Sequence, residues 1–185
     1  MGIRRYLTPE NWYSNHVELL LKREPEGLKE IPLRQGHRVE RICNNNVADS
    51  QRFEPEMYTR IYQRMLLHGD YGFFGYVDGR CACRCWGKVN PQEETYYGLN
   101  LDLPDDSIYV HYVETAEDSR RQGLAKECLD ALVKACGDHA MYVMVDMENA
   151  ASMRLHKGLG FREEAVLFVK KRYMEDKTVI HWIAE

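Results

Sequence analysis

Two arginines and a glycine stand immediately before a stretch whose apolar residues recur at helical spacing. The letters SRRQGLA cover residues 119–125 and continue as KECLDALVKAC. The first turn of a helix carries unpaired backbone N–H groups and the positive end of the helix dipole, and a glycine there lets an anion approach closely. Charge-assisted contacts from Arg120 and Arg121 would add about 1.5 to 3 kcal/mol each when partly desolvated. The stretch therefore predicts a site for a phosphate or a diphosphate.

The common nucleotide-binding patterns are absent, and the arginine stretch by itself has a simpler interpretation. Neither G-x-G-x-x-G nor G-x-x-x-x-G-K-[ST] occurs in the chain, so the sequence supports neither a Rossmann dinucleotide site nor a P-loop. Taken alone, the R-x-x-G-x-A pattern more often marks a solvated helix start. The diphosphate prediction therefore depends on a second motif.

Three of the six cysteines alternate along one expected strand and raise the question of a metal site. Cys81, Cys83 and Cys85 would lie on one face of that strand. At about 3.3 Å per residue the outer two would be about 13 Å apart, whereas zinc holds its sulfur ligands at about 2.3 Å. We therefore expect no metal, and we expect free thiols in a reducing compartment.

The charge and the apolar pattern exclude several classes of protein. The chain has 185 residues and a formal net charge of -4, so it lacks the basic surface of a nucleic-acid-binding protein. No apolar run approaches the roughly 20 residues that span a bilayer. The N-terminus lacks the apolar core of a signal peptide, and Tyr6 stands where a myristoylation pattern has serine or threonine. We expect a cytoplasmic protein with no membrane or nucleic-acid partner.

The elements that would position these residues form an α/β pattern. Thr8 before Pro9 is typical of a helix start and predicts a first helix to about Arg23, followed by a linker over residues 24–37. Periodicity and turn residues predict helices over residues 54–69, 123–136 and 149–158, and strands over residues 38–43, 71–77, 81–89, 107–115, 141–147, 163–174 and 178–185. Strand-helix alternation favours parallel neighbours and the hairpin favours antiparallel ones, so we expect one mixed sheet flanked by helices.

A second motif lies 24 residues after Ala125. The strand-like MYVMVDME leads there into NAASMRLHKGLGFREE. The chain resembles the GCN5-related N-acetyltransferase (GNAT) superfamily, whose members carry R/Q-x-x-G-x-G/A at the start of one helix and N-x-x-A/S-x-x-L-Y-x-x-x-G-F on the next. The matching residues are Arg120, Gly123 and Ala125 in the first motif, and Asn149, Ser152, Leu155, Gly160 and Phe161 in the second. The resemblance is clear over residues 71–185.

The resemblance implies a GNAT fold, with a central mixed sheet of about six to seven strands flanked by helices. It implies an acetyltransferase domain over residues 38–185. An N-terminal helical extension over residues 1–37 would precede that domain, and the resemblance assigns it no role. Dimers are common in the superfamily, so the resemblance also allows a homodimer.

The resemblance implies acetyl-CoA as co-substrate. Pantetheine would pair with the backbone of Val113, Glu114 and Thr115 at the end of the strand before the arginine turn. The pyrophosphate would lie on that turn, held mostly by backbone N–H groups, at Arg120, Arg121, Gln122, Gly123, Leu124 and Ala125. Asn149 would cap the second helix and touch the pantetheine arm, with Ser152 one turn further on. Their plain alternatives are a simple N-cap and ordinary helix surface.

Three residues are candidates for catalysis. His156 occupies the position where many superfamily members have a tyrosine that protonates the departing CoA thiolate, and a packed histidine is the alternative. Amide formation also needs a neutral amine, which costs about 4.6 kcal/mol at pH 7 for a lysine-like amine. Tyr109 stands where many members have a glutamate base. His111, on the same expected strand face, is therefore the leading candidate for accepting the proton, and a satisfied sheet histidine is its alternative.

The resemblance implies an enzyme, an N-acetyltransferase that joins an acetyl group to a primary amine of a small molecule. The amine would attack the thioester directly in a ternary complex. One alternative keeps this chemistry but uses a peptide or protein amine. The other is a CoA-binding regulatory module without turnover, because the tyrosine and the glutamate of many members are both replaced.

Overall fold

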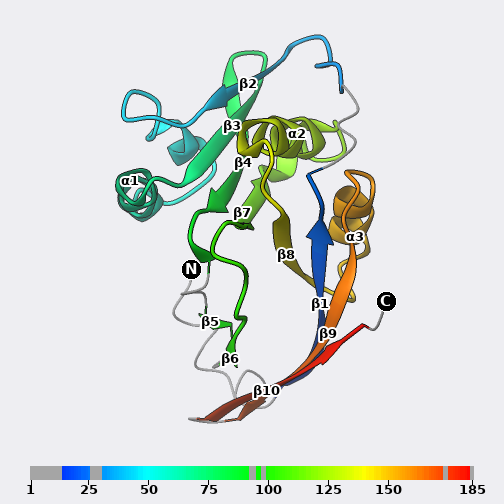
Figure 1. Ribbon diagram of the computed structural model, residues 1–185. Helices are drawn as coiled ribbons and strands as arrows, with labels where there is room; N and C mark the ends of the chain where they lie inside the picture. The colour runs from blue at the N-terminus through cyan, green and yellow to red at the C-terminus, as the bar shows by residue number, and fades with distance from the viewer. Residues whose placement is uncertain (1–13, 26–30, 92–94, 97–98, 173–174, 184–185) are drawn as a thin grey trace. The chain divides into compact units, whose positions relative to one another are not determined.

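The computed structural model describes residues 14–25, 31–91, 95–96, 99–172 and 175–183. The chain forms two compact units (Figure 1). Unit 1 comprises Met1–Arg23, Pro91–Asp105 and Tyr142–Glu185, and unit 2 comprises Glu24–Asn90 and Asp106–Met141. No helix in these described ranges is long and apolar enough to cross a membrane. The expected domain boundary between residues 37 and 38 stays a prediction.

Unit 2 contains the arginine stretch and is built on antiparallel strands. Its strands follow the order β7-β4-β3-β2. They are β2 (His37–Arg41), β3 (Tyr71–Val77), β4 (Arg80–Lys88) and β7 (Ile108–Thr115). Its helices are η3 (Asp49–Arg52), α1 (Met57–His68), η5 (Glu117–Ser119) and α2 (Leu124–Cys136). The predicted hairpin is confirmed, with the turn between Val77 and Arg80 joining β3 to β4.

Helix α2 packs closely on the sheet of unit 2, and this fixes the start of the helix. A Cβ at Gly75 on β3 would stand 2.5 Å from the Cys128 sulfur and 2.8 Å from Leu124, so only glycine leaves room for the helix. Leu124, Cys128, Leu129 and Leu132 are all buried. Burying such side chains stabilises the unit by about 1.5 to 3 kcal/mol each. The helix start is therefore held on a rigid support.

Unit 1 contains the second motif. Its strands follow the order β10-β9-β1-β8. They are β1 (Ser14–Arg23), β8 (Met141–Asp146), β9 (Arg162–Arg172) and β10 (Glu175–Trp182), with α3 (Ala150–Lys157) between β8 and β9. A separate two-stranded ladder pairs β5 (Thr95–Tyr96) with β6 (Leu99–Asn100). The predicted strand-helix-strand alternation of this half is confirmed.

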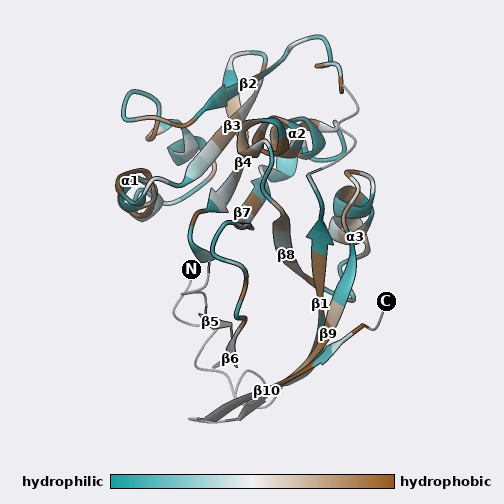
Figure 2. Cartoon of the chain, in the orientation of Figure 1, coloured by the Kyte–Doolittle hydropathy of each residue, from teal (hydrophilic) through white to brown (hydrophobic). Residues whose placement is uncertain are grey.

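The helix expected to run to Arg23 is wrong for the described residues of that segment. Ser14–Arg23 form strand β1, which pairs antiparallel with β9. Leu19, Leu20 and Leu21 are all buried, although successive side chains of a strand point to opposite faces. A strand covered on both faces has a continuous apolar run, which periodicity cannot distinguish from a buried helix. The middle of β1 carries the apolar colour in Figure 2. Residues 8–13 of the expected helix lie outside the described residues.

The predicted α/β class is confirmed. The expected sheet of about six to seven strands omitted β1, which was assigned to a helical extension. Among the described residues, unit 2 contains four strands, and unit 1 contains four strands besides the ladder of β5 and β6. The sequence therefore predicted the elements that carry both motifs and missed the N-terminal strand.

Candidate functional site

The arginine stretch forms a turn with two residues in the left-handed backbone conformation. Arg121 has φ +65° and Gly123 has φ +85°. The first hydrogen bonds of α2 are donated by Lys126 and Glu127 to the Gly123 carbonyl, and no side chain caps the helix. The N–H groups of Leu124 and Ala125 precede these donors. Successive N–H groups in such a turn form a concave site for an anion.

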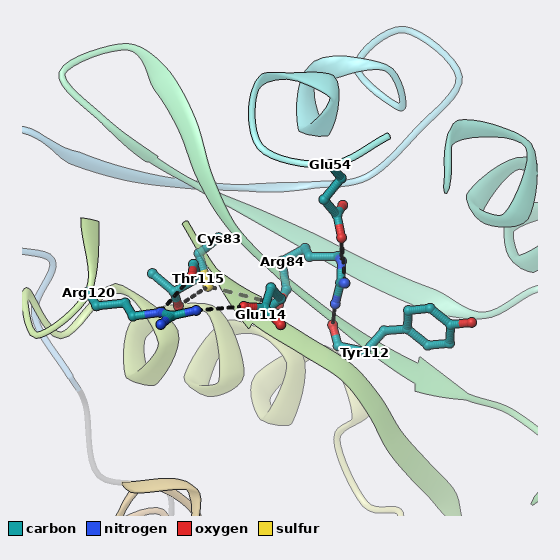
Figure 3. Close-up of polar contacts among 7 residues, drawn as sticks. All are labelled: Glu54, Cys83, Arg84, Tyr112, Glu114, Thr115 and Arg120. Carbon is teal, nitrogen blue, oxygen red and sulfur yellow. Dashed lines mark hydrogen bonds and ion pairs between the residues drawn. The ribbon is translucent and has the colours of Figure 1, made fainter. Parts of the chain in front are cut away.

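Arg120 uses its side chain within the protein. Its Nη2 donates to Glu114 Oε1 at 3.2 Å and its Nε donates to the Thr115 carbonyl at 3.2 Å (Figure 3). Both partners are about half exposed, and a surface ion pair of this kind contributes at most about 1 kcal/mol. The guanidinium of Arg120 therefore ties the turn to the end of β7. Arg121 is exposed and its side chain has no polar partner among the described residues.

Arg34 is a cation near this turn that the sequence analysis missed. The buried carboxylate of Glu127 accepts the Arg34 backbone N–H at 3.1 Å and contacts His37 Nδ1 at 2.7 Å. This anchoring places the Arg34 guanidinium 3.1 to 3.2 Å from where a Cβ of Gly123 would stand. Segments 90 or more residues apart make these contacts, so no local pattern could have predicted them.

Strand β7, whose end is predicted to pair with pantetheine, contains a bulge. Glu114 lies opposite Arg84 and His111 lies opposite Trp86, with a register shift between them. Two residues of β7, Tyr112 and Val113, therefore oppose one residue of β4. Tyr112 has φ +50°. The strict alternation used to predict which side chains share a face with His111 does not hold across this bulge.

His111 and Tyr109 lie near one another on β7, with ring centroids 6.1 Å apart. Tyr109 is buried. His111 Nε2 is buried, and no described group forms a hydrogen bond with it. Burial, together with the charges of Lys88 and Arg84, lowers the pKa of His111 to about 4. The imidazole is therefore neutral at pH 7 and can accept a proton.

Three residues of the second motif region, Asn149, Ser152 and His156, are joined by contacts along α3 in unit 1. Asn149 is the N-cap residue, and its side-chain oxygen accepts the Ser152 N–H at 3.0 Å. His156 Nδ1 lies 2.9 Å from the Ser152 carbonyl and 3.3 Å from the Ser152 hydroxyl. Asn149, Ser152 and His156 therefore form one continuous polar arrangement along the helix.

The contacts of His156 define its tautomer. A carbonyl can only accept, so Nδ1 carries the proton and Nε2 is an acceptor. The side chain is 1% exposed, and Nε2 has no hydrogen-bond partner within the described ranges. Burial lowers the pKa of His156, and its contact with the Ser152 backbone opposes this only partly. His156 is therefore a neutral ring with a buried acceptor, not a ready proton donor at Nε2.

The cysteines offer thiols and no metal site in the described residues. All six cysteines are free, and only Cys43 is exposed. Thr115 Oγ1 donates to Cys83 Sγ at 3.3 Å. No group of three or more potential metal ligands occurs in the described ranges.

A cavity of about 340 Å³ lies in unit 2 beside the end of β7. Its walls include Glu54, Tyr58, Arg84, Glu114 and Arg120. A volume of this size is at the lower end of the range for small-molecule sites. The cavity is therefore a polar recess next to the predicted pantetheine strand.

Comparisons with known proteins place these features in a family. Residues 39–161 match the sequence profile of the acetyltransferase (GNAT) family. The L-methionine sulfoximine/L-methionine sulfone acetyltransferase of Salmonella typhimurium is 37% identical over 60 residues, which are 31% of this chain and 32% of that protein. The L-amino acid N-acyltransferase MnaT of Escherichia coli is 35% identical over 60 residues, again 31% of this chain and 32% of that protein. The match thus spans about a third of either relative.

The chain is also similar in structure to proteins of this kind. The structure of yncA from Salmonella typhimurium, solved with its cofactor acetyl-CoA, has a TM-score of 0.53 and 15% sequence identity. The similarity covers 82% of this chain and 96% of that one. At 15% sequence identity, this structural similarity shows that the two chains share a fold and nothing more.

Proposed function

Because the chain belongs to the GNAT acetyltransferase family, we propose that it transfers an acetyl group from acetyl-CoA to the primary amine of a small molecule. The amine attacks the thioester directly in a ternary complex, the carbon–sulfur bond breaks, and CoA leaves as the free thiol as the amine loses one proton. One observation carries the proposal: the turn from Arg121 to Ala125 presents unpaired N–H groups and a guanidinium without a polar partner among the described residues. That donor set suits a diphosphate.

In this proposal the CoA diphosphate contacts the backbone of the turn, and Arg121 and Arg34 add positive charge. Arg120 supports the turn instead, because its guanidinium contacts Glu114 and Thr115 and its backbone N–H donates to the Glu117 carbonyl. The backbone of Val113, Glu114 and Thr115 pairs with pantetheine. The contacts with the pantetheine arm that the family resemblance implies for Asn149 and Ser152, both in unit 1, stay predictions. Holding thioester and amine together supplies most of the rate enhancement.

Two histidines have distinct roles in the proposal. His111 accepts the proton of the attacking amine, directly or through water, because its Nε2 lacks a partner in the described part of the chain and its lowered pKa keeps the ring neutral at pH 7. A base with a pKa of about 4 is weak, so the amine loses its proton mainly as the tetrahedral intermediate forms. His156 accepts a hydrogen bond at Nε2 from the bound cofactor. Tyr109 orients His111.

A small acceptor is supported by the two relatives named above, which are acyltransferases of amino acids or amino acid derivatives. An acceptor of this size would fit the scale of the cavity beside β7. We also propose a cytoplasmic location, where the six free thiols stay reduced. Formation of a homodimer is part of the same proposal.

Release of the CoA thiol from acetyl-CoA tests this proposal. Purified protein is incubated with amino acids, amino acid sulfones and sulfoximines, other small primary amines, and a lysine-containing peptide, each compared with its N-acetylated form. We expect thiol release with at least one free small amine and none with its N-acetylated form. Release only with the peptide would favour a protein acetyltransferase, and tight CoA binding without release would favour a regulatory module.

A further inference from the structure

A buried ion pair links β4 to Glu54, which lies between η3 and α1 in unit 2. Arg84 Nε donates to Glu54 Oε1 at 2.6 Å, and Arg84 Nη2 contacts the same carboxylate (Figure 3). Glu54 also accepts the Tyr62 hydroxyl at 2.7 Å. Arg84 is 6% exposed and Glu54 is 8% exposed. A buried pair of this kind often contributes less to stability than apolar residues of equal volume, so its other contacts become informative.

The third donor of Arg84 holds the bulge of β7. Arg84 Nη1 donates to the carbonyl of Tyr112, the residue with φ +50° (Figure 3). A left-handed conformation at a residue other than glycine costs about 1 to 3 kcal/mol and persists only where the surroundings impose it. The guanidinium also lies 5.2 Å from the centre of the Tyr112 ring. Arg84 thus contacts both the backbone and the ring of the bulged residue.

The bulge in turn positions His111. Neighbouring side chains of a regular strand point to opposite faces, yet the His111 and Tyr112 ring centroids are 5.1 Å apart and nearly perpendicular. The Tyr112 ring is held against α1 by Tyr58 and Tyr62, at centroid distances of 6.3 Å each. His111 therefore packs against a ring whose place depends on the bulge.

We propose that Arg84, held by Glu54, is a positioning residue that fixes the Tyr112 bulge and through it the orientation of His111 for acyl transfer. This inference rests on the proposed function, because His111 is its candidate base. It explains why a charged pair is retained inside the unit. The fork of a guanidinium can contact a carboxylate and a carbonyl simultaneously, which a lysine ammonium cannot reproduce in the same geometry.

The variant Arg84→Lys separates this role from simple charge pairing. Lysine keeps a positive charge for Glu54 but loses the fixed fork that reaches the Tyr112 carbonyl. We expect kcat to fall by about 10- to 100-fold while KM for acetyl-CoA changes by less than about twofold. A merely destabilised protein would show a lower melting temperature without this separation of kcat from KM.

A second readout does not require turnover. The charged groups that act on His111 are Lys88 and Arg84, both on β4, and its ring neighbours are Tyr109 and Tyr112. If the bulge relaxes, His111 gains contact with water and its pKa rises from about 4 toward about 6.5. An NMR titration of the histidine rings measures this shift in wild type and Arg84→Lys.

Arg52→Lys is the matched control. Arg52 also forks between a carboxylate and a β4 carbonyl, with Nη2 donating to Asp118 at 2.6 Å and Nη1 to Cys81 O at 3.1 Å. Its contacts lie away from Tyr112, so we expect its kcat and the His111 titration to match wild type. If Arg84→Lys does not fold, Glu54→Gln is measured in its place. This variant weakens the contact that holds the Arg84 guanidinium beside the Tyr112 carbonyl.

The outcomes separate the two proposals. If Arg84→Lys, or Glu54→Gln in its place, leaves both kcat and the pKa of His111 unchanged, the proposed role of Arg84 is overturned. Absence of acyl transfer by wild type overturns the proposed function, whereas the titration still reports whether Arg84 positions His111. Equal losses in the Arg52 and Arg84 variants also overturn the inference, because they would indicate a general loss of stability.

Discussion

His156 shows how a single contact defines the chemistry that a side chain can perform. The Ser152 carbonyl holds the proton on Nδ1, and burial keeps the ring neutral. The sequence motif left open whether this histidine donates a proton in place of tyrosine. In the described structure its buried Nε2 is an acceptor, so we propose that it receives a hydrogen bond from the cofactor.

Two substitutions at position 156 distinguish the two ring nitrogens. Asn can reproduce the Nδ1 donor to the Ser152 carbonyl but places no atom at Nε2, whereas Gln can place an acceptor near Nε2. We expect His156→Asn to lower kcat/KM for acetyl-CoA by about tenfold, in line with loss of one buried hydrogen bond. We expect a smaller loss for His156→Gln. Steady-state kinetics with a melting curve for each variant provides the measurement, and wild-type kcat/KM in His156→Asn would contradict the assignment.

At the scale of single residues, the sequence identified the glycine and arginines of the turn but not the directions of their side chains. Arg120 contacts Glu114, six positions earlier in the chain, and this contact depends on the shape of the turn. Arg34 approaches Gly123 because a buried carboxylate on α2 holds its backbone. Contacts of that range depend on the folded structure. The roles of these residues in binding stay predictions.

The turn between β7 and α2 is the element on which cofactor binding depends. Glycine suits position 123 for two reasons: the backbone there is left-handed, and the Arg34 guanidinium approaches it closely. An alanine at position 123 would strain the left-handed backbone and would push the Arg34 guanidinium away by a few tenths of an ångström. The turn therefore couples a local conformation to a distant segment of the chain.

Gly123→Ala tests this element against a control at the other end of the same helix. Gly137 also has a positive φ, but nothing lies within 4 Å of a Cβ added there. We expect both alanine variants to lose about 1 kcal/mol or more of stability. We expect only Gly123→Ala to weaken CoA binding, by about tenfold or more. Calorimetry measures the CoA affinity of each variant, and urea unfolding measures its stability. Equal CoA affinities in the two variants would contradict the proposal that the turn at Gly123 binds CoA.

Elements with a clear local signal in the sequence were predicted well, and features that depend on a partner strand were not. The periodicity of α2 and the turn of the β3-β4 hairpin were sufficient to predict both. Strand β1 was mistaken for a helix because Leu19, Leu20 and Leu21 are consecutive. The β7 bulge was missed because Arg84, a residue of the neighbouring strand, supports it. In each case the deciding contact comes from a partner strand.

At the scale of the whole molecule, family and fold follow from two short motifs carried on alternating strands and helices. The family match covers residues 39–161, so it includes both motifs. The helix-start turn lies in unit 2 and the second motif in unit 1. Each unit carries the elements predicted around its motif, which is why the fold was predictable. The acceptor was not predictable, because no motif marks the residues that would recognise it.

Calorimetric titration of the purified chain with CoA, acetyl-CoA and S-acetylpantetheine tests the central claim most directly. S-acetylpantetheine lacks the diphosphate but keeps the pantetheine arm and the thioester. We predict one binding site per chain for CoA and acetyl-CoA, and affinity for S-acetylpantetheine that is weaker by at least about tenfold, since charge-assisted contacts to the diphosphate are lost. Absence of binding by the folded protein, or equal affinity for acetyl-CoA and S-acetylpantetheine, would contradict the claim that the turn at Gly123 holds the diphosphate.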